Sequence, residues 1–143
     1  MAIFFDSFIT LAGDVMFRGT SAPNPSDFYA ILTSSARLRT DNLATVIANE
    51  LAATNGYVRK LLSFSAGSYD NTDSRHEFPN LTFTHTATGG NIVFQSVVIL
   101  ADANSTVGDS AGKLAAFSSE LSPITILATQ SRTFTVPIFT KSL

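Results

Sequence analysis

The two histidines of the chain are the residues best suited to bind a metal ion. His76 and Glu77 are adjacent, and His85 follows in a segment that alternates like a strand. A zinc or iron site needs at least three strong ligands around one point, and Glu77 is the nearby residue able to supply the third. Because His76 falls in a polar stretch and His85 in a strand, we expect two unrelated histidines and no metal site.

Two short segments resemble ion-binding loops but lack essential residues. The segment from Asp102 begins like a calcium-binding loop, yet Val107 stands where the turn needs glycine and Lys113 where a bidentate glutamate is needed. Residues 108–114 resemble a phosphate-binding loop, but the segment is too short and has Leu114 in place of the hydroxyl that binds Mg²⁺. We expect ordinary surface turns at both places.

The sequence also lacks the motifs that place residues for nucleophilic or acid–base catalysis. The chain has no cysteine and no Gly-x-Ser-x-Gly elbow. Asp70, Asp73 and Glu77 share one polar segment, which is more typical of a solvated loop than of a carboxylate pair or a calcium site. We therefore predict no catalytic residue, no cofactor and no enzymatic activity.

The arginines suggest a different kind of chemistry, the pairing of charges between subunits. Arg37 and Arg39 precede the one helix that the sequence predicts, and Arg59 and Lys60 follow it. One hypothesis is that Arg37, Arg39 and Arg59 form salt bridges to a neighbouring subunit. The alternative is that they are solvated charges at one end of the helix, since exposed ion pairs contribute only about 0–1 kcal/mol.

The composition favours a protein that is partly covered by a partner. Hydrophobic residues make up 45% of the 143 residues and charged residues only 14%, against about 25% charged residues in an average soluble domain. The formal net charge of -2 includes no run of like charge, which argues against nucleic-acid binding. The most apolar run, residues 92–101, is far shorter than the roughly 20 residues of a membrane-spanning helix, so we expect no membrane partner.

The first 20 residues are predicted to form an extended N-terminal arm or an edge strand. Ile3, Phe4, Phe5, Phe8 and Ile9 follow neither a strand alternation nor a helical stripe throughout. Because an apolar cluster near a terminus is typical of an interface, we expect these five residues to bind a neighbouring chain. The alternative is an ordinary first strand of the domain that we assign to residues 21–143.

The remaining sequence predicts an antiparallel β-sandwich of seven or eight strands with one short helix. The helix is expected at about residues 42–54, because Thr40 and Asp41 suit an N-cap and Asn55 and Gly56 suit a positive φ at its end. Strands are expected at residues 28–32, 57–64, 81–86, 92–101, 113–117, 124–127 and 132–140, with polar loops at 67–77 and 102–112.

Three of these strands carry a more specific prediction. The continuous apolar run at 28–32 is typical of a strand buried on both faces, and the run at 92–101 of a central strand. Residues 81–86 alternate, which places His85 on the apolar face. Pro137 cannot donate to a ladder, so it predicts an edge strand or a bulge.

The order of these elements resembles the small virion structural proteins of tailed bacteriophages, particularly those of cyanobacterial and marine phages. The similarity covers residues 28–143 and leaves the first 27 residues outside it. The similarity is carried by short sequence motifs at residues 28–32, 55–59, 88–91, 97–103, 114–117 and 133–136, and by Phe83.

The resemblance implies a non-enzymatic component of an assembled particle. One such function is a capsid cement or decoration protein on the outer capsid surface, which self-associates, often as a trimer, and bridges neighbouring copies of the major capsid protein. The other is a module of the tail, neck or fibres that binds a receptor or glycan, for which the loops at 67–77 and 102–112 are the expected surface.

Overall fold

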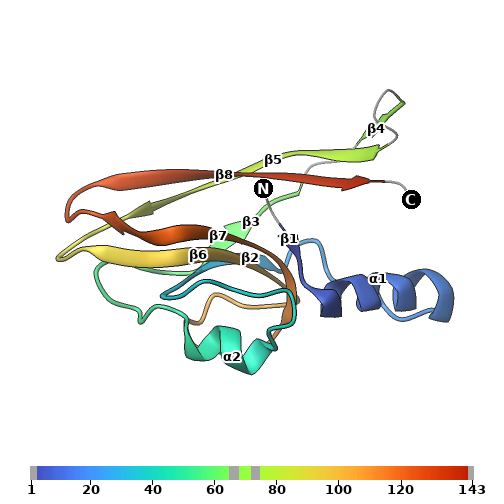
Figure 1. Cartoon of the computed structure of the whole chain (residues 1–143), viewed down its shortest axis with the longest axis horizontal. Helices are drawn as coiled ribbons and strands as arrows, with labels where there is room; N and C mark the ends of the chain where they lie inside the picture. The colour runs from blue at the N-terminus through green and yellow to red at the C-terminus, as the bar shows by residue number, and fades with distance from the viewer. Residues whose placement is uncertain (1–2, 65–67, 72–74, 142–143) are drawn as a thin grey trace.

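The computed structural model describes residues 3–64, 68–71 and 75–141. Its described part contains two antiparallel sheets and two helices (Figure 1). The five-stranded sheet has the order β1-β7-β6-β2-β3 and the three-stranded sheet the order β4-β5-β8. The elements are β1 (Ile3–Phe4), α1 (Asp6–Arg18), β2 (Phe28–Thr33), α2 (Leu43–Ala48), β3 (Lys60–Leu62), β4 (Ser68–Asp70), β5 (Arg75–Thr86), β6 (Ile92–Ala101), β7 (Lys113–Ile126) and β8 (Ser131–Lys141).

The prediction of a mainly β, antiparallel fold is confirmed. Apart from the two-residue β1, the described residues form seven strands of three residues or more. The prediction of a single helix is wrong, because α1 precedes α2.

The centre of the five-stranded sheet, around β2 and the end of β6, is buried on both faces. On β2, Leu32 joins a core cluster with Phe83 of β5, whereas its neighbour Ile31 joins a second cluster with Val46 of α2 and with Phe5. Figure 1 shows β5 and β8 on one side of this sheet and α2 on the other. A strand covered on both faces has no solvent side to fill with polar residues, which explains the continuous apolar run at 28–32 and confirms its prediction.

The position of β6 agrees with its apolar sequence. This strand lies between β7 and β2, in the middle of the five-stranded sheet. Its alternate residues also divide between the two clusters, with Ile99 in the first and Val98 and Leu100 in the second. The prediction of a central strand at residues 92–101 is therefore confirmed.

The strand β5 alternates as predicted. Leu81, Phe83 and His85 are buried between the sheets, and the threonines at 82, 84 and 86 are exposed. Its partner β8 is an edge strand, and Phe78 pairs with Ile138 while Leu81 pairs with Val136.

That register leaves two residues of β5 opposite Pro137 of β8. Pro137 thus lies both on an edge strand and at a bulge, two places that tolerate a residue without an N–H. Both alternatives that the sequence offered for this proline are confirmed together.

Other predicted boundaries were wrong. Strand β3 occupies only three residues of the predicted 57–64, and the described residues of the predicted loop 67–77 lie mainly in β4 and β5. The two strands predicted at 113–117 and 124–127 form the single strand β7. This strand bulges where Gln95 of β6 faces residues 120–123, which carry the fully exposed Leu121.

The prediction of an extended arm over residues 1–20 is wrong, because most of the described residues of this segment are helical. The alternative of an edge strand holds for β1, which lies at the edge of its sheet and pairs with β7 through Ile3 and Phe4. The helix α1 follows at once and ends at Gly19, whose φ of 72° and N–H bond to the carbonyl of Asp14 form a left-handed C-cap. Because the strand period and the helix period meet at Phe5, neither pattern fits the whole segment.

The helix α2 is shorter than the predicted 42–54. Asn42 is its N-cap, and its side chain accepts a hydrogen bond from the N–H of Thr45 at 2.8 Å. Beyond Ala48 the chain turns to pair with β2, so that the N–H of Leu51 donates to the carbonyl of Leu32 at 3.0 Å. Those bonds to β2 replace the helical ones.

The positive φ predicted for the pair Asn55 and Gly56 is confirmed, although the helix ends before them. A Cβ on Gly56 would lie 2.5 Å from the hydroxyl of Thr88 and 2.7 Å from the carbonyl of Thr86. This turn needs glycine for its space as well as for its φ.

The first testable prediction concerns Phe5, which is fully buried against Phe117 with ring centroids 4.8 Å apart. We expect Phe5→Ala to lower the free energy of unfolding by about 3–5 kcal/mol, because the cavity is enclosed by core side chains. Urea denaturation measures this. The matched control is Phe17→Ala on the exposed side of α1, which we expect to change stability by no more than about 0.5 kcal/mol; equal effects would show that Phe5 is not a core residue.

Candidate functional site

The residues predicted to form an interface separate into two groups. Phe5, Arg37 and Arg59 are buried within their own chain. Ile3, Ile9 and Arg39 are exposed, and Phe4 and Phe8 are half-buried and stacked on each other with centroids 5.9 Å apart. The hypothesis that all eight residues contact a neighbouring subunit is therefore wrong for the first group.

Arg59 forms the best-enclosed ion pair of the described residues, with Glu50. Its Nη2 lies 2.7 Å from Oε2 and its Nε 2.8 Å from Oε1, so the guanidinium holds the carboxylate with two parallel bonds. Both side chains are almost completely buried. A neighbouring subunit cannot reach Arg59, so the prediction of an intersubunit salt bridge at this position is corrected to an internal one.

Two neighbouring groups also bond to Glu50. The hydroxyl of Tyr57 donates to Glu50 Oε1 at 3.0 Å and accepts from the N–H of Leu32 at 3.1 Å. Gly108 donates its N–H to Glu50 Oε2 at 2.8 Å.

The guanidinium of Arg59 also donates hydrogen bonds to the loop before β7. It donates to the carbonyls of Asn104 at 3.2 Å and Asp109 at 2.8 Å. The charge pair thus ties the segment after α2, the start of β3 and the loop 102–112 together.

The pKa shifts of this cluster follow from its burial. Burial raises the pKa of Tyr57 above its ordinary value, and the charge of Glu50 raises it further. Burial alone would lower the pKa of Arg59, but hydrogen bonding and attraction to Glu50 outweigh it and raise the pKa. Tyr57 therefore stays protonated and Arg59 stays charged at physiological pH.

Arg37 is also used internally. Its Nε donates to the carbonyls of Ser35 and Ala36, and its guanidinium bonds to the hydroxyl of Ser35 and lies 3.6 Å from Asp41. The sequence analysis grouped Arg37 and Arg59 as interface residues. In the structure each bonds to a different loop of its own chain.

Arg39 remains near the surface, as both hypotheses for the arginines required. Its Nη2 lies 2.7 Å and its Nε 3.0 Å from Oδ1 of Asp6, the first residue of α1. The N–H of Asp6 also donates to the carbonyl of Arg39 at 3.1 Å. This pair fixes the start of α1 to the segment that precedes α2.

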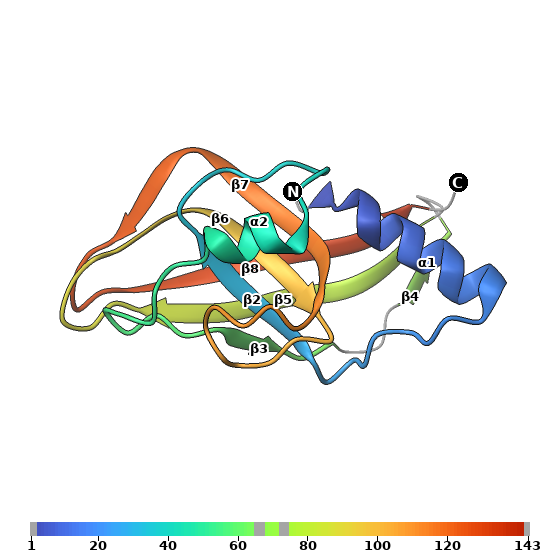
Figure 2. The same cartoon turned by 90° about the horizontal axis from the view of Figure 1, so that it is seen from below.

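The largest exposed apolar side chains of the N-terminal segment lie on α1. None of its residues is buried, and Ile9, Met16 and Phe17 are 52%, 74% and 83% exposed. Figures 1 and 2 show α1 at the edge of the five-stranded sheet, below the right-hand ends of β5 and β8. The sequence predicted an apolar N-terminal surface, but it missed Met16 and Phe17 because it assigned no helix there.

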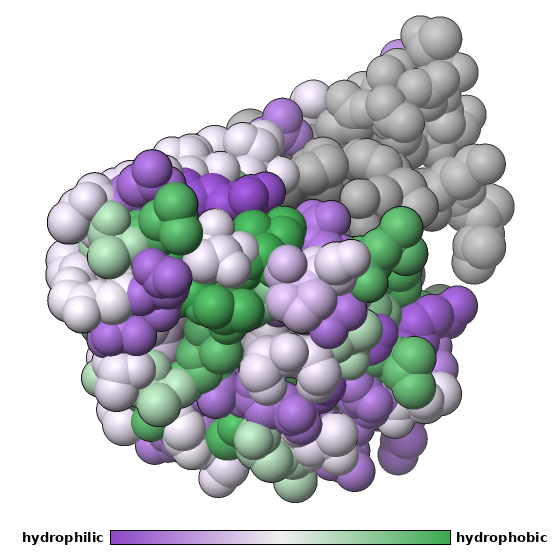
Figure 3. All heavy atoms as spheres, turned by 60° about the vertical axis from the view of Figure 1, so that its left-hand side comes forward, coloured by the Kyte–Doolittle hydropathy of each residue, from purple (hydrophilic) through white to green (hydrophobic). Residues whose placement is uncertain are grey.

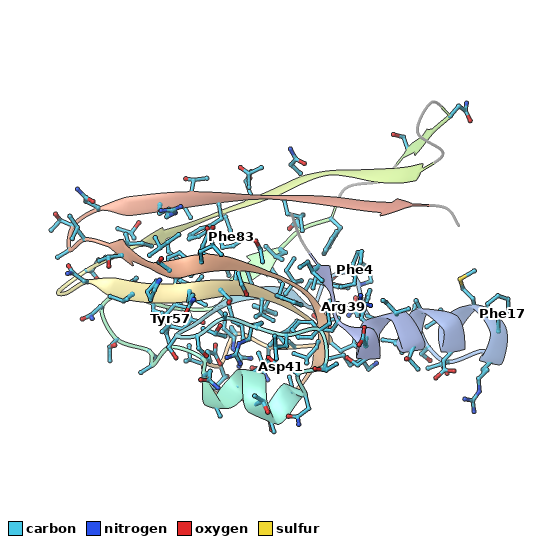
Figure 4. All side chains as sticks on the ribbon, in the orientation of Figure 1. Phe4, Phe17, Arg39, Asp41, Tyr57 and Phe83 are labelled. Carbon is cyan, nitrogen blue, oxygen red and sulfur yellow. The ribbon has the colours of Figure 1, made fainter. Side chains whose placement is uncertain are left out.

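The body of the protein also exposes large apolar side chains, among them Leu38, Leu61 and Leu121. On the face seen in Figure 3, apolar patches lie among hydrophilic and neutral residues. Figure 4 places Phe17 at the end of α1 farthest from the sheets, whereas Phe83 lies between the sheets and Arg39 near the start of α1. Because α1 exposes Met16 and Phe17 and buries none of its own residues, we take its surface as the candidate functional site.

The sequence offered three places for a metal ion: the histidines, the acidic segment 70–77 and the calcium-like segment from Asp102. Among the described residues, no group of three metal-ligating side chains comes together. The side chains of His76, Asp73 and Glu77 lie outside the described part. In the calcium-like segment, Lys113 Nζ lies 2.6 Å from Asp102 Oδ2 and lowers the pKa of that carboxylate, so the residue at the twelfth position neutralises the first.

His85 occupies an apolar cage. Its ring stacks on Tyr57 at 5.5 Å and meets the edges of Phe83 and Phe134 at 5.7 and 5.9 Å. Both of its ring nitrogens are buried and form no hydrogen bond with the described residues. Burial, followed by repulsion from Lys60, lowers the pKa of His85 to about 4, so the imidazole is neutral at physiological pH.

In the described part of the chain, neither helix is long and apolar enough to cross a membrane.

No family model, no curated protein and no solved structure matches this chain. The resemblance to phage virion proteins therefore stays a prediction from sequence words and element order.

The buried pair gives a second prediction. We expect Glu50→Gln to lower the free energy of unfolding by about 3–5 kcal/mol, because it leaves the Arg59 charge buried without a counter-charge. The matched control, Asp6→Asn, removes the exposed pair with Arg39 and should cost no more than about 1 kcal/mol. Chemical denaturation of both variants measures the difference, and a Glu50→Gln variant as stable as Asp6→Asn would contradict the assigned role.

His85 gives a third prediction, which concerns pH. Between pH 6.5 and about 4 the unfolded chain binds a proton at His85 that the folded protein does not bind. Stability should therefore fall as the pH is lowered through this window, by up to about 3 kcal/mol. Denaturation curves at a series of pH values measure the slope, and His85→Phe should flatten it; a variant with the same slope as the wild type would refute the assignment.

Proposed function

We propose that this protein is a non-enzymatic structural component of a bacteriophage virion, a capsid cement protein. It self-associates on the outer capsid surface and bridges neighbouring copies of the major capsid protein. The observation that carries the proposal is α1, a helix with three large, exposed apolar side chains and no buried residue. It belongs to a chain with only 14% charged residues.

The physical argument starts from the weakness of short helices in water. An isolated helix of 13 residues is marginal in water even when its sequence favours helix, and most helical stability in proteins comes from packing of an apolar face. Here the body contacts α1 chiefly at its start, through the pairing of β1, the burial of Phe5 and the Asp6–Arg39 pair. A partner that covers the exposed side chains of α1 supplies the missing packing.

The body has the features that suit a cement protein. Residues of both sheets share one core cluster, which supports the sandwich arrangement that we propose for the body. The polar groups of its buried ion pair are bonded within the chain. Such a body keeps its shape while α1 attaches to a neighbour. The element order that resembles phage virion proteins points to the same function.

Localisation on intact particles tests the proposal. An antibody to the protein, seen by negative-stain electron microscopy, should label the outer capsid surface. Labelling confined to the tail, neck or fibres would support the alternative function and overturn the cement function. Absence of the protein from purified particles would overturn both.

A fourth prediction tests the part played by α1. Phe17→Ser should reduce the number of copies retained on washed particles by about tenfold or more, because central apolar contacts dominate interface energies. The matched control is Leu121→Ser, which removes a fully exposed apolar side chain from the bulge of β7. Quantitative mass spectrometry of the particles measures retention.

The thermal midpoints of both variants should equal that of the wild type, since neither side chain packs in the core. Full retention of the Phe17→Ser variant would contradict a role for α1 in attachment. Loss of Leu121→Ser alone would place the attachment surface on β7 instead.

A further inference from the structure

His85 is a buried, titratable side chain that the proposed function does not use. It is 0% exposed and lies between the two sheets, where its ring stacks on Tyr57. Phe83 and Phe134 enclose the ring from its own sheet. Neither ring nitrogen finds a hydrogen-bond partner among the described residues. A buried polar group without a partner costs free energy that contact with water would recover, so His85 weakens the contact between the sheets.

The charged groups around His85 oppose a second proton on its ring. Lys60 of β3 repels that proton, and Arg132, directly opposite on β8, is also positive. The carboxylate of Glu50 bonds to the hydroxyl of Tyr57, on which His85 stacks, but it is already neutralised in its own ion pair. Strand β6, which belongs to the other sheet, has no titratable residue. Among the described residues, a protonated ring at this place therefore has neither a counter-charge nor an acceptor for its two N–H groups.

The three-stranded sheet is held to the five-stranded sheet mainly by side chains of their shared core cluster. In the described part of the chain, the strands of each sheet pair only with one another. The connections at 87–91 and 127–130 join the two layers at one end (Figure 1). The five-stranded sheet has a second core cluster on its other face, which includes Phe5 and Val46. It therefore keeps a packed core when the three-stranded sheet moves away.

We propose that His85 is an acid-sensitive release between the two sheets: a second proton on its ring separates the three-stranded sheet from the five-stranded sheet, which stays folded. A protonated imidazole carries a charge and two N–H donors, which water satisfies once the ring is exposed. Water reaches the ring when β5 moves away from Tyr57. The two connections keep the released sheet tethered, so the sheets pack again when the proton leaves.

The inference goes beyond the proposed function and does not rest on it. It also goes beyond the loss of overall stability expected in acid, because it places the first opening at one contact between the sheets. The pKa of His85 is lowered to about 4 in the packed state and returns to about 6.5 in contact with water. Proton linkage then raises the ratio of open to closed molecules about 30-fold between about pH 7.5 and pH 5.

Amide hydrogen exchange of the full chain at about pH 7.5 and pH 5, corrected for the intrinsic exchange rates, tests the release. A small sheet that has lost its apolar cover is marginally stable in water, so its amides exchange when it is released. Protection of β5 and β8 should fall about 30-fold at the lower pH. Protection of β2 and β6 should stay at least about tenfold higher than that of β5 and β8, because β2 and β6 exchange only when the whole chain unfolds.

Two variants assign the acid response to His85. His85→Phe fills the same aromatic cage without a titratable group, so it should abolish the fall in protection of β5 and β8. The matched control, His76→Gln, removes the only other imidazole of the sequence and should keep the fall. Circular dichroism checks that both variants are folded.

Three results would overturn the proposal. Equal protection of all four strands at pH about 5 would show that acid unfolds the whole chain at once. Unchanged protection of β5 and β8 between the two pH values would show that their opening leaves His85 buried. Both of these results are read on the wild-type chain, so they stand even where a variant does not fold. A fall that persists in His85→Phe, or that is lost in His76→Gln, would assign the acid response to another group.

Discussion

The buried pair of Glu50 and Arg59 is the interaction on which the rest of the body depends. Two buried charges are tolerated only when each is neutralised by the other and every remaining donor and acceptor is satisfied. In this pair each side-chain nitrogen and oxygen has at least one partner, supplied by the pair itself, by Tyr57 and Gly108, and by carbonyls of the loop 102–112. As a result, segments far apart in sequence are held in one arrangement, and the sheets can pack against a fixed support.

The helix α1 differs from this body in every respect. Its charged side chains lie near the surface, and none of its residues is buried. Its pairing with the body is made by its first residue and by the preceding β1. A body stabilised by internal pairs and a helix with large exposed apolar side chains fit a protein that assembles with a partner. In the proposed function, a neighbouring chain of the particle covers these side chains.

The sequence predicted the fold correctly at positions where a single local rule decides the structure. The continuous run at 28–32, the alternation of Leu81, Phe83 and His85, and Pro137 each reflect a local rule of burial or hydrogen bonding, and each prediction was confirmed. It failed where distant contacts decide. Pairing with β2 ends α2 earlier than its sequence predicts. Nothing in the sequence around Glu50 indicated that this residue would form a buried ion pair with Arg59. The helix α1 was missed because a strand and a helix meet within the first 20 residues.

Amide hydrogen exchange over residues 6–18, compared between the dilute free chain and the assembled particle, tests the central claim most directly. Exchange reports the local opening of each segment, and a helix without cover opens easily. The account predicts fast exchange in α1 of the free chain and strong protection in the particle, with β6 protected in both. Equal exchange of α1 in the two states would contradict the claim that assembly covers this helix.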